Sequence, residues 1–493
     1  MKNKQNSEYV TNDAAVSIDG ISIAKFVVPT LPGIDSRDGT CNTRPLSELG
    51  NAMRISDAHD GNINYVYDTK AWLHWQDGAW CWDLDGARVR SLAARLLKQI
   101  YSEGCLHSFD AGLFANWSRM SQKEHTIKAS VSLLSDFEQL RLPLCLIDAD
   151  LFLVGIDNAK QVIDLKTGIA RPATQSDYIT KSLGVYQLGE SSKAVRWLEF
   201  LDQVFGDDVE LIDWIKRWCG YLLTGSTEEH FFIFCFGLGA NGKSVLAETL
   251  RFILGDYARA MSSETLTESK RSAGGAIPDI ADLIGARLAM CSETESGAAL
   301  AESLVKSLVS GDSMTTRKLY SAPVQFTPLF KLMMLGNHKP IIKGNDNGMW
   351  RRIRLIPFLR TFNLEERDAG LSDKLKTEAP HILAWMVEGC IDWQKRGLKD
   401  TPLTIQQATG DYQEEQDLIG SWLAECCNLS HSSKALSSVL YGNYKDWCII
   451  NSLQPINNAV FGRSIGDRGY NKRKSNGNTL WLGIELKPSD EVI

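Results

Sequence analysis

The feature that most constrains this chain is one short segment, Gly237-Leu238-Gly239-Ala240-Asn241-Gly242-Lys243-Ser244. An uninterrupted apolar run precedes it at 231–236, and apolar residues at helical spacing follow it at 245–254. An apolar run bounded by turn residues is typical of a strand that is covered on both faces in a parallel sheet. Glycines between such a strand and a helix let the backbone N–H groups point at a phosphate. The pattern therefore predicts a phosphate-binding loop in an α/β domain; the alternative is a chance match within a glycine-containing turn.

Two side chains of this segment have expected roles of their own. Lys243 is expected to contact the β- and γ-phosphates of a nucleoside triphosphate, and Ser244 to hold Mg²⁺. The partial positive charge at the helix N-terminus adds to the attraction for phosphate. We expect ATP and Mg²⁺ as cofactors, with nucleotide contacts from Gly237, Gly239, Ala240, Asn241, Gly242, Lys243, Ser244 and Val245.

Polar side chains follow two more segments that are predicted to be strands of the same sheet, 287–292 and 330–335. Glu293 and Glu295 come directly after the first of them. We expect Glu293 to hold the metal and to polarise the attacking water, with Glu295 assisting. Asn337 comes after the second strand, where its amide is placed to orient that water. The alternatives are a solvated strand end for the glutamates and a turn-capping role for Asn337.

The overall charge restricts how this chain contacts nucleic acid. Its 493 residues carry a formal net charge of −7 at pH 7, and its pI is near 5.7. These values argue against a protein that coats nucleic acid with its whole surface, but they permit concentrated basic sites. The length predicts two to four domains.

Membrane and metal signals are weak. No apolar run approaches the length needed to cross a bilayer, and residues 1–6 lead into no apolar signal segment. The eleven cysteines form no C-x-x-C pair of the kind that zinc sites use. Buried free thiols in a reducing cytosol are the favoured interpretation. We therefore expect no membrane partner.

Four motifs occur in order along the predicted α/β region. They are the loop with Asn before Gly-Lys-Ser, the Ser-Glu strand end at 292–293, the Gly-Asn-His-Lys-Pro strand end at 336–340, and Trp-Arg-Arg-Ile-Arg-Leu-Ile-Pro-Phe at 350–358. As a set they resemble superfamily 3 helicases, above all the helicase part of phage and plasmid primase-helicases of the satellite-phage and poxvirus type. The resemblance covers about 45–490 and includes upstream segments at 162–168, 177–181 and 220–225.

The resemblance implies an α/β fold with an AAA+-type P-loop motor domain, an α+β N-terminal pre-helicase domain and a C-terminal winged-helix module. The implied regions, in chain order, are a flexible lead-in (1–44), the α+β pre-helicase domain (45–190), a helical lead into the motor (191–227), the P-loop superfamily 3 core (228–362), a helical segment with a Gln/Glu-rich link (363–416) and the winged-helix module (417–493).

Arginines before the last predicted strand take a role from the resemblance. Arg351 and Arg352 resemble the arginine finger that one subunit supplies to its neighbour's ATP, and Arg352 is the first choice. A planar guanidinium suits the charge of a phosphoryl-transfer transition state. Without the resemblance, the alternative of solvated surface arginines is favoured.

Residues 311–326 resemble the hairpin that lines the central pore of such rings. Arg317, Lys318 and Tyr320 are expected near its tip, where they offer phosphate partners and a stacking face to single-stranded DNA. An ordinary charged surface hairpin is the alternative.

The tail resembles the winged-helix ends of the same family. Residues 439–448 and 457–467 are predicted to be helices, and 472–478 a wing. This is the most basic stretch of an acidic chain, so duplex binding is expected there. The expected contacts are Arg463, Arg468, Lys472, Arg473 and Lys474. A solvated loop or a protein-docking surface is the alternative.

The leading hypothesis is an ATP-dependent replicative DNA helicase of a phage, satellite or related mobile element, in the cytoplasm of a bacterial host. The resemblance implies a homo-hexameric ring that moves 3′→5′ on single-stranded DNA and acts on forked DNA. The alternatives are an origin-binding initiator ATPase and a regulatory or defence ATPase that does not unwind DNA.

A priming activity is disfavoured. The primase domain of larger family members is not expected here, so a separate primase is the expected partner. Residues 146–150 read as an apolar strand that ends in Asp148-x-Asp150, a pattern by which primases bind metals. No third carboxylate or partner histidine follows a matching pattern.

Overall fold

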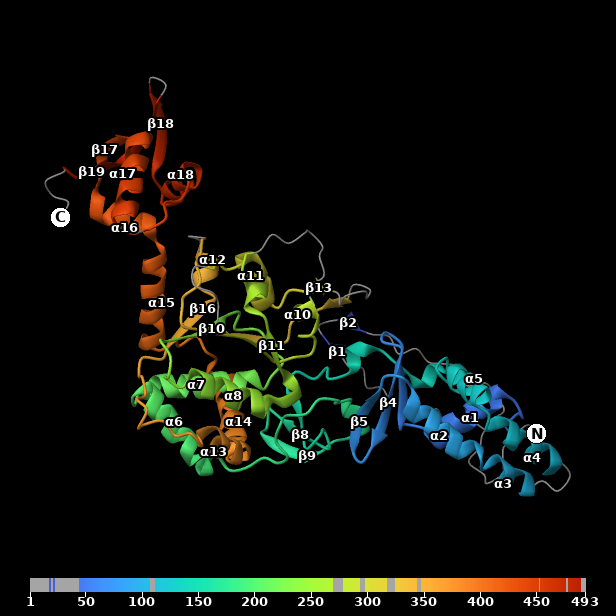
Figure 1. Ribbon diagram of the computed structural model, residues 1–493. Helices are drawn as coiled ribbons and strands as arrows, with labels where there is room; N and C mark the ends of the chain where they lie inside the picture. Colours follow the sequence, from blue (N-terminus) through green and yellow to red (C-terminus); the bar gives the residue numbers. More distant parts are fainter. Residues whose placement is uncertain are drawn as a thin grey trace, which may run out of the picture. The chain divides into compact units, whose positions relative to one another are not determined.

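The computed structural model describes most of the chain (Figure 1). The described residues are 17–18, 21–22, 44–106, 111–268, 278–292, 298–316, 324–343, 347–451, 453–475 and 478–488. The chain divides into two units, one formed by residues 1–58 and 92–134 and the other by residues 59–91 and 135–493. The expected flexible lead-in lies outside the described residues, apart from Arg44 and the paired strands β1 (Ser17–Ile18) and β2 (Ile21–Ser22).

Helices make up the described body of the first unit. They are α1 (Glu48–Ala58), the end of α2 (Ala87–Leu97), α3 (Ile100–Leu106), α4 (Ala111–Ser121) and α5 (Glu124–Leu134). The apolar spacing over 88–101 predicts one helix, but the structure has two. The backbone N–H of Gln99 bonds to Leu96 three residues back, which tightens the turn between them.

Two small sheets precede the central sheet of the second unit. One has the order β5 (Ala79–Asp83), β4 (Ala71–Gln76), β3 (Ile63–Val66) and β6 (Arg141–Leu142), and the other the order β7 (Leu153–Ile156), β8 (Gln161–Asp164) and β9 (Ile169–Pro172). Asp77 and Gly78 join β4 to β5 with φ of 52° and 86°, the left-handed conformations that a two-residue hairpin loop requires. The expected α+β character of this region is confirmed.

Residues 146–150 do not form the strand that the sequence predicts. A 3₁₀ turn, η2 (Leu144–Leu146), leads into Asp148, whose φ is 52°. The Asp148 carboxylate accepts hydrogen bonds from the Thr180 N–H and hydroxyl at 2.8 and 2.7 Å, and lies 3.2 Å from Lys181 Nζ. The prediction of a strand ending in Asp-x-Asp is therefore wrong, because Asp148 is used to hold the 180–181 segment in place.

A five-stranded sheet forms the centre of the second unit. Its order is β11 (Ala258–Met261), β12 (Leu288–Ser292), β15 (Lys331–Gly336), β10 (Phe232–Phe236) and β16 (Ile353–Pro357), and every neighbouring pair is parallel. The predicted strands at 231–236, 287–292 and 330–335 are confirmed as β10, β12 and β15. Because all five strands run in the same direction, their carboxyl ends lie together at one end of the sheet.

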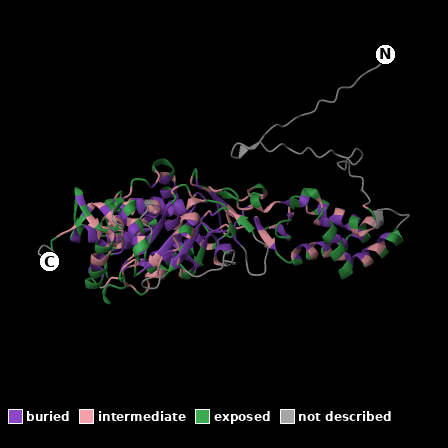
Figure 2. Ribbon diagram, turned by 90° about the horizontal axis from the view of Figure 1, so that it is seen from above, coloured by how far each residue is buried: buried purple, intermediate pink, exposed green. Residues whose placement is uncertain are grey.

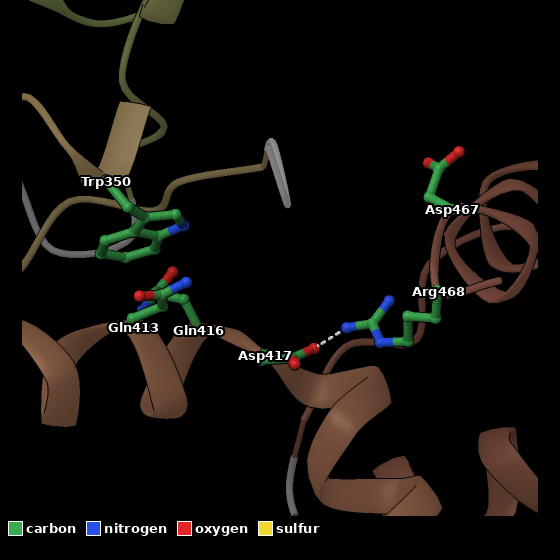
Figure 3. Close-up of a pocket in the computed structure, with 6 residues that line it drawn as sticks. All are labelled: Trp350, Gln413, Gln416, Asp417, Asp467 and Arg468. Atoms are coloured by element: carbon green, nitrogen blue, oxygen red, sulfur yellow. Dashed lines mark hydrogen bonds and ion pairs between the residues drawn. The ribbon is translucent and has the colours of Figure 1, made fainter. Parts of the chain in front are cut away.

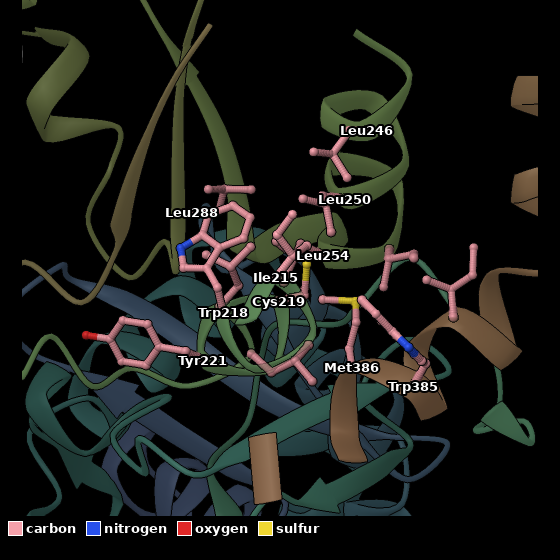
Figure 4. Close-up of a cluster of buried hydrophobic side chains, with 14 of the residues drawn as sticks. Ile215, Trp218, Cys219, Tyr221, Leu246, Leu250, Leu254, Leu288, Trp385 and Met386 are labelled. Carbon is pink, nitrogen blue, oxygen red and sulfur yellow. The ribbon is translucent and has the colours of Figure 1, made fainter. Parts of the chain in front are cut away.

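Helices cover this sheet. They include α6 (Val195–Phe205), α7 (Val209–Leu222), α8 (Lys243–Leu254), α13 (Leu371–Thr377) and α14 (Ala379–Arg396). Figure 4 shows side chains of α7, α8 and α14 meeting in one buried cluster, among them Trp218, Leu250 and Met386. Buried residues gather along the strands and the helix faces that pack on them (Figure 2).

Two buried basic side chains hold the end of α7 to the amino end of the parallel strands. Arg287, which precedes β12, donates hydrogen bonds to the carbonyls of Leu223 and Leu153, the latter at 2.8 Å. Lys331, the first residue of β15, donates to Thr224 O. Burial lowers the pKa of both groups. Cations near helix carbonyls complement the helix dipole, so these bonds fix α7 and β7 to the central sheet.

The chain after the sheet differs from prediction at one place. Residues 406–416 are predicted to be a link, but they belong to a helix, α15 (Leu403–Gln416), with Ile405 and Tyr412 buried. These two apolar positions lie seven residues apart, on one face of a helix. The prediction of a link is wrong because a Gln/Glu-rich helix with so few apolar residues is recognisable only once it is packed.

The C-terminal module consists of α16 (Leu418–Cys426), β17 (Cys427–Leu436), α17 (Ser437–Ile450), α18 (Asn458–Asp467), β18 (Asn471–Ser475) and β19 (Asn478–Leu486), with the sheet order β17-β19-β18. Its core contains Trp422, Tyr444, Phe461 and Trp481, all fully buried. The predicted helices at 439–448 and 457–467 are confirmed as α17 and α18, whereas the predicted wing at 472–478 falls on β18, the first residue of β19 and residues 476–477, which lie outside the described residues. Within the described ranges, no helix combines the length and apolar character needed to cross a membrane.

Candidate nucleotide and DNA sites

Glycines shape the loop between β10 and α8. Gly239 and Gly242 have φ of 106° and 90°, which residues with a Cβ rarely adopt. A Cβ on Gly237 would lie 2.2 Å from Asn241 Nδ2, and one on Gly242 would lie 2.8 Å from the Val204 side chain of α6. Around Gly239, by contrast, a Cβ would meet nothing within 4 Å. The loop is therefore held tightly at both ends and open in the middle, where a phosphate would lie.

Lys243 lies beneath this loop and is only 7% exposed. Its Nζ donates hydrogen bonds to Gly237 O at 2.6 Å and to Asn241 Oδ1 at 3.0 Å. Asn241 in turn donates from Nδ2 to Phe358 O at 3.2 Å. Burial lowers the pKa of Lys243. A phosphate bound at the loop would stabilise the charged ammonium, because a nearby anion favours the protonated form. Ser244 is exposed beside it, in the first turn of α8.

The parallel register brings the end of β15 next to the loop. Phe236 of β10 pairs with Gly336 of β15, and the Gly237 N–H donates to Gly336 O at 3.3 Å. Asn337 follows at once and is exposed. Its predicted place near the γ-phosphate is compatible with this register, and its role stays a prediction.

The predicted carboxylates cannot be placed in the same way. β12 pairs with β15 up to Ser292 and Leu335. Glu293 and Glu295, which follow Ser292 in the sequence, lie outside the described residues. Their roles as metal ligand and water activator stay predictions, as does Mg²⁺ binding by Ser244.

A cavity of about 240 Å³ adjoins the loop on the side of α6. Its apolar lining comes from Phe200 of α6, Val245 of α8, and Phe362 and Leu371 after β16. Arg196, Gln203, Glu366, Arg367 and Asp368 also line it. Apolar walls with a few polar groups are typical of small-ligand sites. Ala240 and Gly242 of the loop also line the cavity, and sequence reasoning found these two and Val245. It missed the others, because the cavity joins segments more than 100 residues apart that share no motif.

Arg351 and Arg352 lie at the amino end of the parallel strands, whereas the loop lies at their carboxyl end. They precede Ile353, which pairs with Phe232 at the start of β10, whereas the loop follows Phe236 at its end. A five-residue strand spans about 16 Å, which is longer than an arginine side chain. Neither arginine therefore reaches the loop of its own chain.

The local contacts distinguish these arginines. Arg351 is exposed, whereas Arg352 is partly buried and donates from Nη1 to Gly348 O at 2.7 Å. The third arginine of the motif, Arg354, lies over the ring of Phe231 at 4.9 Å. Arg354 thus packs against the chain before β10, while Arg351 faces solvent.

The two strands of the predicted hairpin are present, and its place in a pore stays a prediction. β13 (Met314–Thr316) pairs antiparallel with β14 (Val324–Phe326). Arg317, Lys318 and Tyr320 lie outside the described residues, so their place at the tip stays a prediction.

The five basic residues predicted to bind duplex DNA are not equivalent. Arg468 donates to the carboxylate of Asp417, and the two side chains point at one another in Figure 3. Lys472 is exposed but places its Nζ 4.6 Å from the ring centre of Trp481. The remaining three are exposed: Arg463 on α18, and Arg473 and Lys474 on β18. Their DNA contacts stay predictions.

Two family models match parts of the chain. Residues 52–206 match a family described as D5 N terminal like. Residues 235–352, which contain the predicted phosphate-binding loop, match a family whose function is not known.

Several relatives come from large DNA viruses and are named as candidate helicases. One from Acanthamoeba polyphaga mimivirus is 29% identical over 324 residues, which are 61% of this chain and 33% of that protein. One from Frog virus 3 is 31% identical over 276 residues, 52% of this chain and 28% of that protein. One from Invertebrate iridescent virus 3 is 29% identical over 340 residues, 62% and 36% of the two chains. This chain thus covers about a third of the length of these curated relatives.

Among solved structures, the apo C-terminal region of NrS-1 is 9% identical and aligns with 89% of this chain and 100% of that chain, at a TM-score of 0.45. That score is too low to define the fold. By the D5 N-terminal-like match, the helicase-named viral relatives and the motif set, the chain is similar to the D5-like primase-helicase family.

Proposed function

We propose that this protein is an ATP-dependent replicative DNA helicase that works as a homo-hexameric ring. The observation that carries the proposal is that the loop and the arginine pair lie at opposite ends of neighbouring parallel strands. A site that needs both can be completed only between two copies of the chain. The strand order, with β10 between β15 and β16, is the order expected of an AAA+-type motor.

The nucleotide would be held by parts that are close together in the structure. The backbone of 237–244 would surround the phosphates, and Lys243 would leave its two oxygen partners for the β- and γ-phosphates. The cavity between α6 and 362–371 would take the nucleoside, because its apolar walls suit a base. Mg²⁺, held by Ser244 with Glu293, would neutralise charge on the phosphates. The exposed Ser244 and the open space at Gly239 fit such a group.

DNA would be contacted by two separate elements. The β13–β14 hairpin would meet single-stranded DNA in the pore, and the C-terminal module, proposed to be a winged helix, would bind the duplex ahead of it. We propose 3′→5′ movement on forked DNA, in the cytoplasm of a phage-infected bacterium and beside a separate primase. These assignments rest on the family resemblance.

The decisive test of the proposal is strand displacement on forked DNA with and without ATP. Replacing Lys318 with alanine is expected to leave basal ATP hydrolysis within about twofold while unwinding and stimulation by single-stranded DNA fall, because a pore residue touches DNA phosphates and not the nucleotide. Unwinding at the wild-type rate would remove Lys318 from the pore. A wild type that hydrolyses ATP but displaces no strand would instead favour the initiator or the regulatory ATPase.

Removing the C-terminal module is expected to weaken duplex binding but not ATP hydrolysis. A chain that ends after Gln416 keeps α15 whole and loses the module from the Asp417 cap onward. The lost affinity is expected to be salt-sensitive, with a log–log slope of about −0.9 per phosphate contact, because each contact releases a counterion. Fluorescence anisotropy over a salt series measures it.

Single substitutions provide the matched control for this truncation. Arg463→Ala is expected to reduce the salt slope by about one contact, whereas Arg468→Ala is expected to keep it, since Arg468 is already paired with Asp417. Equal duplex binding by full-length and truncated protein would show that the module docks a protein. Loss of preference for one sequence over random duplex would identify the module as an origin reader.

A further inference from the structure

Helix α15 contacts the chain directly after Asn337. The Tyr412 hydroxyl donates a hydrogen bond to Pro340 O. One helical turn later, the Gln416 side chain accepts a hydrogen bond from the Ile342 N–H at 3.2 Å. Both bonds join a side chain of α15 to the backbone of 340–342, so the helix holds the path of that segment. That segment leads directly out of the strand end at which Asn337 is predicted to orient the attacking water.

The same tyrosine packs against the turn that carries the arginine pair. The rings of Tyr412 and Trp350 meet edge to face, with centres 5.2 Å apart. Trp350 is 7% exposed and immediately precedes Arg351 and Arg352. Tyr412 itself is 1% exposed. One buried side chain therefore touches both the segment after Asn337 and the residue before the arginines.

Further contacts fix α15 on the sheet. Thr409 Oγ1 accepts from the Leu355 N–H of β16 at 3.1 Å. Lys339 lies 2.7 Å from the Glu415 carboxylate and places its Nζ 5.4 Å from the Tyr412 ring centre. The second half of the helix is thus bonded to β16 and to the segment that follows β15.

At its C-terminal end α15 passes into the C-terminal module without an intervening loop. Asp417 ends α15 and is the N-cap of α16, where its Oδ1 accepts from the Gly420 N–H at 2.9 Å. The same carboxylate accepts a hydrogen bond from Arg468, the C-cap residue of α18 (Figure 3). α18 carries Arg463, one of the predicted duplex contacts. One capping residue and one ion pair therefore connect α15 to α18.

We propose that Tyr412 is a positioning residue that couples ATP hydrolysis to duplex binding through α15. The inference rests on the proposed function and adds a route of regulation to it. Nucleotide-dependent movement of the segment after Asn337, or of the arginine turn, moves the Tyr412 ring and with it α15, Asp417 and α18. Linkage requires the reverse effect as well: duplex bound at the module changes the affinity for nucleotide by the same factor.

The test is Tyr412→Phe, which keeps the ring against Trp350 and removes only the bond to Pro340 O. ATP affinity is expected to stay within about twofold, while kcat falls by about 10-fold or more, because small displacements of a water-positioning group are costly. The change in duplex affinity that ATP causes in the wild type is expected to disappear. Tyr257→Phe is the matched control: its hydroxyl is also buried and donates to a backbone carbonyl, that of Lys181, at 3.2 Å.

A wild-type kcat with a wild-type response to duplex in Tyr412→Phe would overturn the proposal, as would an equal loss in Tyr257→Phe. Arg468→Ala isolates the far end of the route: duplex binding stays, but its dependence on ATP is expected to vanish. If the wild type binds ATP without hydrolysing it, the proposed motor function fails, yet duplex affinity with and without ATP still tests the coupling. A wild type whose duplex affinity ignores ATP would refute it.

Discussion

Replacing Lys243 with alanine is expected to abolish ATP hydrolysis while leaving the fold intact. The side chain is the one cation that the loop itself provides, and its present partners are two oxygens of the loop, Gly237 O and Asn241 Oδ1. Without it, the developing charge on the β- and γ-phosphates has no ammonium to stabilise it. Phosphate release measured at saturating ATP checks this expectation, and thermal unfolding checks the fold.

The control for Lys243→Ala is Lys193→Ala, an exposed lysine paired with Glu190 at 2.7 Å. Hydrolysis is expected to be unchanged in it. A Lys243→Ala protein that hydrolyses ATP at a near-normal rate would show that the loop does not bind the reacting phosphates.

Replacing Arg352 with alanine is expected to lower the rate of ATP hydrolysis by about 10³-fold or more while sparing nucleotide binding. The structural reason is that the arginine turn and the loop lie at opposite ends of the parallel strands. The arginine must then act on a nucleotide held by another copy. Single-turnover hydrolysis together with a binding isotherm separates the two effects.

Mixed rings test the same idea from the other side. Arg352→Ala combined with Lys243→Ala is expected to recover part of the activity, because some interfaces then join an intact loop to an intact arginine. No recovery, in rings shown to exchange subunits, would count against a finger acting between copies. Arg351→Ala tests which of the two arginines is the finger. Arg351 is exposed, whereas Arg352 is bonded to Gly348 O.

The loop and the strands around it could be predicted because their signals are local. The run at 231–236 is apolar without interruption, and the glycines of 237–242 occupy backbone conformations that few other residues adopt. Strand, loop and helix follow one another directly, so no distant contact is needed to recognise them. The same holds for α18, which begins at the Asn457 cap with its side chain bonded to the Val460 N–H.

Local signals failed where packing decides. The segment 406–416 is polar enough to be taken for a link, and it belongs to the helix 403–416 because Ile405 and Tyr412 bury one face against the central sheet. Residues 146–150 are apolar and end in two aspartates, yet the bonds of Asp148 to Thr180 hold a turn there. In both cases the deciding partner is distant in the sequence.

The sequence by itself determined that a glycine-rich loop joins a buried strand to a helix, because backbone conformation and apolar spacing are short-range properties. Only the tertiary structure decided that Arg351 and Arg352 lie away from that loop, because strand order and register set the end of the sheet at which a residue lies. Only the tertiary structure, too, placed Tyr412 between Pro340 and Trp350. Contacts between segments that far apart depend on how the helices pack on the sheet, and no spacing within one segment records it.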